Sequence, residues 1–148
     1  MVYQWKDGAR IKCDANIAGR ICAEMEAAGE LTARNLVEAS RPADAPLHNE
    51  FEWNNTAAAD KWREHQARNI INSIVLVNEQ DKEQSVRAYF KLEARTPTYE
   101  SIVSIVQQED KYAALKEAAL RELSAFQRKY SQITEFEKLF AVIAELGG

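Results

Sequence analysis

The side chains best suited to chemistry in this 148-residue chain are two histidines, each close to a carboxylate. His48 stands two residues before Glu50, and His65 directly follows Glu64. Histidine is the usual general base near neutral pH, and together with a carboxylate it can hold a metal ion. Adjacent residues on a helix point in different directions, however, so a metal site built from Glu64 and His65 is not expected.

The other requirements of catalysis are missing from the sequence. The serines show no nucleophile-elbow pattern, and the chain contains neither a glycine-rich phosphate-binding motif nor an HExxH zinc motif. The acidic pair Glu109–Asp110 stands where carboxylates favour the start of a helix. We therefore predict that the protein is not an enzyme and uses no metal and no small-molecule cofactor.

Two cysteines, Cys13 and Cys22, indicate free thiols. They are nine residues apart, which on one continuous helix is about 13 Å and too far for a disulfide. Free thiols are typical of a reducing compartment. With two cysteines and two well-separated histidines, a four-ligand zinc site is not expected.

Residues 14–41 have the outline of a helix-turn-helix. Asp14 is suited to cap a first helix, Gly29 to end it, and Thr32 to cap a short second helix that stops before Pro42. In the DNA-binding version of this motif, the second helix enters the major groove.

The second helix would present Arg34, Asn35, Glu38 and Arg41. Arginine and asparagine are the usual readers of guanine and adenine, so Arg34, Asn35 and Arg41 are the candidate DNA-binding residues. The alternative is an ordinary helical hairpin, because the helix is short and phosphate repels Glu38. If DNA is bound, a dimer is expected, since one short helix supplies few contacts.

A third helix is expected to run from a cap at Asn54 or Asn55 to Ser73. Its apolar spacing places Trp62 in the core and leaves Arg63 in solvent. Before it, Leu47, Phe51 and Trp53 are expected to anchor a loop to the core, and an aromatic ligand clamp is the alternative.

The apolar period changes from helical to strand-like after residue 73. Residues 74–77 are an apolar run, residues 86–93 alternate apolar and polar side chains, and the polar link 78–84 joins them. This pattern predicts a β-hairpin over residues 74–94. Residues 2–5 also alternate and can supply a third short strand. An apolar hairpin edge left exposed should be covered by a partner chain.

Residues 96–148 read as helices. Apolar side chains recur at spacings of three and four from Tyr112 to Tyr130, and a last helix bears Phe136, Phe140 and Ile143. The short link between these helices predicts an antiparallel hairpin. The expected fold is α+β and mostly α, with about six helices around a central β-hairpin, in a single domain over residues 1–148.

Composition narrows the location and the partners. Hydrophobic residues make up 46% of the chain and charged residues 28%, with a net charge of −4. No basic run is present, which weighs against tight non-specific binding to nucleic acid but leaves room for a small basic face. The absence of a secretory signal and of a 20-residue apolar run predicts a cytoplasmic protein without a membrane partner.

The chain resembles small phage and prophage proteins of unassigned function over nearly its whole length. The segments that carry this resemblance are WKDGAR at 5–10, RPADAPLH at 41–48, FEW at 51–53 and LSAFQRKY at 123–130. Asn54 and Asn55 stand where two acidic residues are expected. These motifs are structural, so the resemblance brings no functional residues. It implies a viral gene product that acts in the cytoplasm of a bacterial host or is packaged in the virion.

The sequence as a whole predicts a non-enzymatic, phage-type binding protein. DNA is the first expected partner, through the helix-turn-helix-like element. The alternative is a protein-interaction module, such as an inhibitor of a host system or a phage assembly or virion component. In either case the partner is DNA or a host or phage protein, and the chain is expected to form a homodimer.

Overall fold

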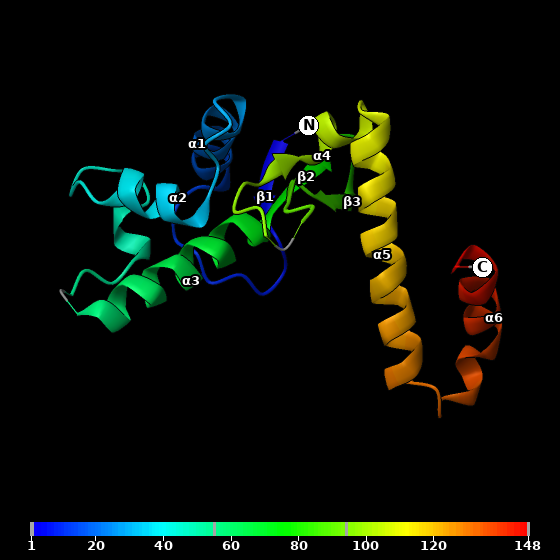
Figure 1. Ribbon diagram of the computed structural model, residues 1–148. Helices are drawn as coiled ribbons and strands as arrows, with labels where there is room; N and C mark the ends of the chain where they lie inside the picture. The colour runs from blue at the N-terminus through cyan, green and yellow to red at the C-terminus, as the bar shows by residue number, and fades with distance from the viewer. Residues whose placement is uncertain (1, 55, 94, 148) are drawn as a thin grey trace. The chain divides into compact units, whose positions relative to one another are not determined.

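The computed structural model describes residues 2–54, 56–93 and 95–147 (Figure 1). Its contacts divide the chain into two compact units, residues 1–104 and residues 105–148. The boundary falls inside the short helix α4 (Ile102–Val106). A single domain over residues 1–148 stays a prediction.

The predicted fold class is confirmed: the described residues form six α-helices and a small antiparallel sheet. The sheet contains β1 (Val2–Trp5), β2 (Ile74–Asn78) and β3 (Asp81–Arg87) in the order β1-β2-β3. The expected N-terminal strand therefore exists, and its pairing on β2 makes β2 the central strand. The first four residues of β2 are all buried, so the apolar run at 74–77 is not an exposed edge.

The hairpin differs in detail from the prediction. Asn78 pairs with Asp81, so a two-residue turn joins the strands in place of the expected link over residues 78–84. The predicted alternation also breaks at Ala88. Ala88 and its neighbour Tyr89 are both buried, whereas Val86 is 47% exposed. Alternation assumes that one strand continues, but β3 ends at Arg87.

A second strand pair begins at this break. β4 (Tyr89–Phe90) pairs with β5 (Glu100–Ser101), which the sequence pattern did not predict. Ala88 joins the two pairs through its backbone: its amide donates to the Ile74 carbonyl at 3.1 Å, and its carbonyl accepts from the Ile102 amide at 2.8 Å. The break thereby connects the three-stranded sheet to the start of α4.

Helix α1 (Ala15–Ala27) has both of its predicted ends. The Asp14 carboxylate accepts hydrogen bonds from the Asn16 and Ile17 amides. At the other end Gly29 adopts a φ of 72°, and the Glu30 amide donates to the Met25 carbonyl. This is the left-handed C-terminal motif for which glycine is the preferred residue.

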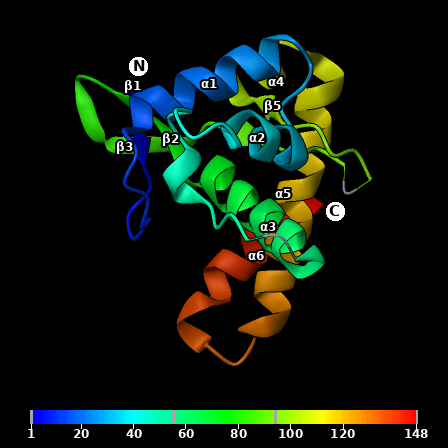
Figure 2. The ribbon, with the colours of Figure 1, turned by 90° about the vertical axis from the view of Figure 1, so that its left-hand side faces the viewer.

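Helix α2 (Ala33–Ser40) begins at Thr32, whose hydroxyl accepts from the Asn35 amide at 3.0 Å. It lies between α1 and α3 in both ribbon views (Figures 1 and 2). The loop that follows contains the 3-10 turn η1 (His48–Glu50) and is anchored as expected. Leu47 and Phe51 are buried, and Trp53 packs against the core.

Helix α3 (Ala57–Ser73) corrects two predictions. Its cap is Thr56, whose hydroxyl accepts from the Ala59 amide, rather than Asn54; the alternative, Asn55, lies outside the described residues. Trp62 and Arg63 also exchange their predicted places, because Trp62 is 49% exposed and Arg63 is 3% exposed.

Arg63 is buried because the loop before α3 provides partners for its guanidinium. Nη1 donates to the carbonyls of Glu52 and Asn54 at 2.9 and 2.8 Å, and Nη2 pairs with Asp60. The guanidinium carbon lies 5.3 Å from the centre of the Trp53 ring, which adds a cation–π contact. A buried charge is tolerated where it is paired and hydrogen-bonded in this way.

One cluster of buried apolar side chains forms the core of the N-terminal unit. The sheet, the three helices α1 to α3, the anchored loop and the segment before β5 all contribute buried side chains to it. Its members include Ala18, Cys22, Leu31, Leu36, Val37, Leu47, Phe51, Ala67, Ile70, Ile71, Ile74, Leu76, Ala88, Tyr89 and Tyr99.

The C-terminal unit is the predicted helical hairpin. α5 (Glu109–Lys129) and α6 (Glu137–Gly147) run antiparallel and are joined through the 3-10 turn η2 (Thr134–Phe136) (Figure 1). Phe126, Tyr130, Phe136 and Phe140 meet where the helices join, with ring centres 4.8 to 6.5 Å apart. Along the described chain no helix is both long and apolar enough to cross a membrane.

Candidate functional site

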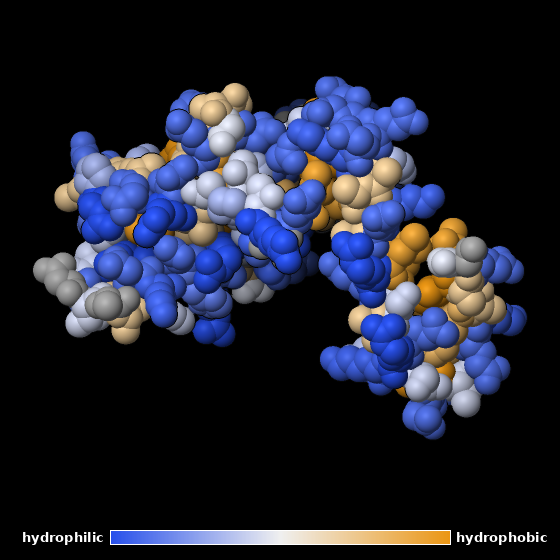
Figure 3. Space-filling model, in the orientation of Figure 1, coloured by the Kyte–Doolittle hydropathy of each residue, from blue (hydrophilic) through white to orange (hydrophobic). Residues whose placement is uncertain are grey.

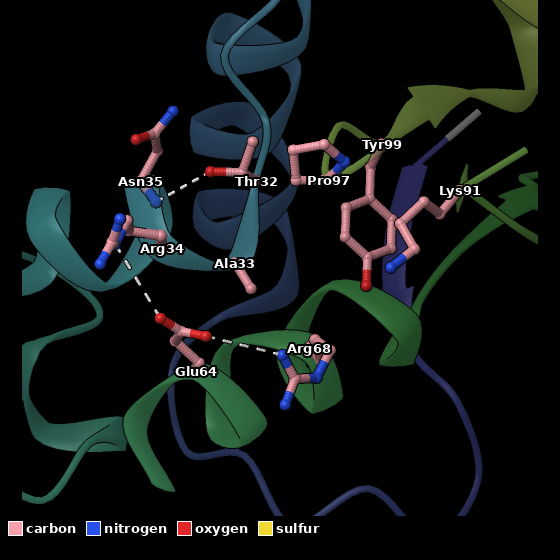
Figure 4. A pocket seen from close by; sticks show the side chains of 9 residues that line it. All are labelled: Thr32, Ala33, Arg34, Asn35, Glu64, Arg68, Lys91, Pro97 and Tyr99. Carbon is pink, nitrogen blue, oxygen red and sulfur yellow. Dashed lines mark hydrogen bonds and ion pairs between the residues drawn. The ribbon is translucent and has the colours of Figure 1, made fainter. Parts of the chain in front are cut away.

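A pocket of about 380 Å³ opens at the start of α2 (Figure 4). Three segments of the N-terminal unit form it: the first turn of α2, the middle of α3 and the chain between β4 and β5. We call it the α2 pocket, and its lining residues are Thr32, Ala33, Arg34, Asn35, Glu64, Arg68, Lys91, Pro97 and Tyr99.

Backbone contacts hold the third wall of the α2 pocket against the first. The Tyr99 amide donates to the Leu31 carbonyl at 2.7 Å, and Thr98 forms a β-bridge with Thr32. Tyr99 itself is 4% exposed and belongs to the core. The pocket is therefore anchored to the buried core of the unit, although two of its walls are far apart in sequence.

The α2 pocket is electropositive. Three cationic side chains, Arg34, Arg68 and Lys91, line it together with one carboxylate, Glu64. Glu64 lies between the two arginines, at 4.0 Å from Arg34 and 3.9 Å from Arg68 (Figure 4). One carboxylate cannot neutralise three cations, so the pocket carries a net positive charge on a chain whose net charge is −4.

The start of α2 adds to this charge. The amides in the first turn of a helix carry a partial positive charge and point along the helix axis towards its beginning. Asn35 is fixed here, because its side-chain amide donates to the Glu30 carbonyl at 2.9 Å. Arg34 projects into solvent, with a side chain that is 82% exposed.

Tyr99 adds a phenol to the pocket wall and no negative charge. Burial raises the pKa of Tyr99, although the positive charges of Arg68 and Arg87 act in the opposite direction. The phenol is thus protonated near neutral pH. Lys91 extends beside the Tyr99 ring in the close view (Figure 4), which leaves this wall able to donate hydrogen bonds to an anion.

The exposed face of α2 is the one that the sequence predicted. Arg34, Asn35, Glu38 and Arg41 are exposed, whereas Leu36, Val37 and Ser40 are buried. Arg34 and Asn35 line the α2 pocket. The structure does not bring Arg41 to them, because it stands two turns further along, at about 10 Å.

Arg41 is already engaged. Its Nη2 and Nε donate to the two carboxylate oxygens of Glu38 at 2.8 and 3.1 Å. This hydrogen-bonded pair lowers the pKa of Glu38. The Arg41 guanidinium also lies 5.3 Å from the centre of the Trp53 ring. Of the two predicted DNA-binding arginines, Arg41 is therefore held by a hydrogen-bonded ion pair, whereas Arg34 has a longer contact of 4.0 Å with Glu64.

Sequence reasoning missed Arg68 and Lys91 as members of the site. Arg68 is half-buried and Lys91 is exposed, and they lie 34 and 57 residues after Arg34 in sequence. One usable signal was the position of Arg68 four residues after Glu64, which places both on one face of α3.

The residues considered first for chemistry serve structural contacts. His48 Nδ1 lies 3.0 Å from the Ser40 carbonyl, and its ring stacks on Trp53. His65 is exposed and stacks on Trp62. Within residues 2–54, 56–93 and 95–147, no three histidine, cysteine or acidic side chains come together as a metal site.

The two cysteines are free, as predicted. Burial raises the pKa of the Cys22 thiol to about 12. Burial also raises the pKa of Cys13, and the nearby Glu50 and Asp14 carboxylates act in the same direction. Both thiols are therefore weak nucleophiles near neutral pH, since the thiolate is the reactive form.

No protein-family model matches this chain, and no curated protein or solved structure matches it either. The geometry of the α2 pocket and of the α2 face is therefore the basis for a function.

Proposed function

We propose that the protein is a non-enzymatic DNA-binding protein that places the start of α2 against the duplex. The observation that carries the proposal is the convergence of Arg34, Arg68 and Lys91 at the first turn of α2. Arginine and lysine side chains and helix N-termini are the groups that bind DNA phosphates. If a backbone phosphate binds in the α2 pocket, the exposed face of α2 would point towards the bases.

Charge and position support this assignment. In a helix-turn-helix, the first residues of the second helix contact base edges. Arg34 and Asn35 occupy that position here, and Arg34 is largely exposed. Because the positive charge is confined to one pocket, few phosphates can be neutralised. Moderate affinity with a shallow dependence on salt is therefore expected.

Fluorescence anisotropy with a labelled duplex of random sequence tests the proposal, at salt concentrations from about 50 to 200 mM. Binding is expected at the lowest salt concentration and should weaken as salt rises. The double variant Arg68→Ala/Lys91→Ala should weaken binding and make the dependence on salt shallower, by about one unit for each phosphate that the variant no longer neutralises.

A matched control is Arg20→Ala on α1, which removes an exposed cation that does not line the pocket. It should leave binding nearly unchanged. Glu64→Gln should change the affinity in the opposite direction. It removes the carboxylate that lines the pocket, so DNA should bind more tightly. No binding at low salt, or equal effects of the pocket variants and the Arg20 control, would exclude DNA binding through this pocket.

A second candidate function is protein binding by strand addition. In the described sheet, β1 and β3 each have one neighbour, so each has an unpaired edge. Val86 on β3 is 47% exposed and would contact an added strand. Pull-down from bacterial lysate with the wild type and with Val86→Lys tests this candidate. A specific partner retained equally by both proteins would argue against the β3 edge.

The phage origin is part of the same proposal. It rests on the resemblance at residues 5–10, 41–48, 51–53 and 123–130, and it would place a DNA-binding protein inside a bacterial host or in the virion. Mass spectrometry of purified particles distinguishes the two places.

A further inference from the structure

The last helix, α6, carries more apolar surface than the C-terminal hairpin buries. Phe140 on α6 joins the aromatic cluster together with Phe136 of η2, and Ile143 on the same side of α6 is buried. A second row of apolar side chains is exposed: Leu139, Val142 and Leu146 are 45%, 50% and 56% exposed. We call this row the α6 outer stripe.

The two apolar rows of α6 lie side by side around the helix. At about 100° per residue, the outer stripe is centred roughly 90° from the row that contains Phe140 and Ile143. A helix with two apolar faces at about a right angle has the geometry of one corner of a four-helix bundle, where each helix packs against two neighbours. The hairpin supplies one of these neighbours, namely α5.

The charges beside the outer stripe identify the other neighbour. Lys138 and Glu145 are both exposed and lie seven residues apart, so both stand on the same flank of the stripe. If a second α6 packs antiparallel with Leu139 opposite Leu146, then Lys138 of each copy lies beside Glu145 of the other. The stripe is thus complementary to itself in both its apolar side chains and its charges.

We propose that the α6 outer stripe is a homodimer interface in which two C-terminal hairpins form a four-helix bundle. The interface has two-fold symmetry, and the axis passes near Val142, so the same residues contribute from both copies. This surface differs from the hairpin edge that the sequence suggested for a dimer. It is also independent of DNA binding by the α2 pocket. Figure 3 shows apolar surface on this hairpin.

Sedimentation equilibrium of the full-length chain tests the interface. The wild type is expected to form a dimer that dissociates on dilution. Val142→Lys places two like charges at the axis and should raise the dimer dissociation constant by roughly a hundredfold. The matched control is Ala144→Lys, which adds the same charge to an exposed position on the opposite side of α6 and should leave the dimer intact.

A charge exchange separates an interface from a folding defect. Lys138→Glu alone and Glu145→Lys alone each create like-charged pairs between copies and should weaken the dimer. The combination Lys138→Glu/Glu145→Lys restores opposite charges and should recover most of the wild-type affinity. Circular dichroism of each variant checks that the helices remain folded. A wild type that is monomeric at all concentrations, or a dimer unaffected by Val142→Lys, overturns the proposal, as does failure of the double exchange to restore affinity.

Discussion

In the N-terminal unit fifteen side chains form one buried cluster, whereas α5 of the C-terminal unit has no buried side chain among the described residues. Of the ten large hydrophobic side chains exposed in the described structure, six belong to the 44-residue C-terminal unit. A hairpin of two helices encloses little volume and cannot bury more than one stripe of each helix. The N-terminal unit is thus stabilised by its own core, and the C-terminal unit is suited to association.

The largest effect should come from a cavity in the N-terminal core. Ile71 on α3 is fully buried. Ile71→Ala removes three carbon atoms and leaves a cavity in the core that is closed to solvent. The free energy of unfolding should fall by about 3–5 kcal/mol. Denaturation by urea measures it. A loss of about 1 kcal/mol or less would mean that this core is loosely packed.

A comparison of two neighbouring residues on α3 should give the next largest effect. Arg63→Ala leaves the Glu52 and Asn54 carbonyls without their partner and removes a buried contact with Trp53. We expect it to lower the free energy of unfolding by about 2–4 kcal/mol. Trp62→Ala, at a half-exposed position, is the control and should cost less than about 1 kcal/mol. If Trp62→Ala lowered the free energy of unfolding more than Arg63→Ala, the result would support the sequence-based prediction that Trp62 lies in the core.

These two positions show where sequence reasoning ends. The ends of α1 and α2 were predictable because caps act through residues at most five positions apart in sequence: Asp14, Gly29 and Thr32 each perform the expected local role. The burial of Arg63 was not predictable, because it depends on carbonyl groups in a loop that precedes α3. A hydrophobicity pattern places tryptophan inside and arginine outside when it cannot detect such partners.

The candidate site divides in the same way. Arg34 and Asn35 were predictable from the outline of helix, turn and short helix, and they line the α2 pocket. Arg68 and Lys91 reach the pocket through tertiary packing, in which the Tyr99 amide bonds to the Leu31 carbonyl. β5 and its pairing with β4 escaped prediction for a related reason, since a two-residue strand leaves no periodic pattern.

The alkaline limit of stability should also reflect the core of the N-terminal unit. Burial raises the pKa of the Cys22 thiol from its ordinary 9.0 to about 12. Above pH 9 the unfolded chain loses this proton while the folded chain keeps it, so stability is full below pH 9 and falls as the pH rises towards 12. By pH 11 the loss from this group should be about 3 kcal/mol.

Cys22→Ala isolates this contribution, because all other ionisable side chains are the same in both proteins. The difference in unfolding free energy between wild type and variant should shrink from pH 8 to pH 11, as followed by urea denaturation at each pH. A constant difference would show that the thiol is accessible to water in the folded state.

The smallest effect should come from the hairpin, and it completes the comparison. Leu123 lies on the predicted inner stripe of α5 but is only half-buried. Leu123→Ala should therefore cost about 1 kcal/mol, below the range for a buried leucine, when it is measured at a protein concentration too low for dimers. Amide hydrogen exchange in α5 reports this local stability separately from that of the N-terminal unit. A loss as large as that of Ile71→Ala would show that the hairpin has a core of its own and needs no second copy to be stable.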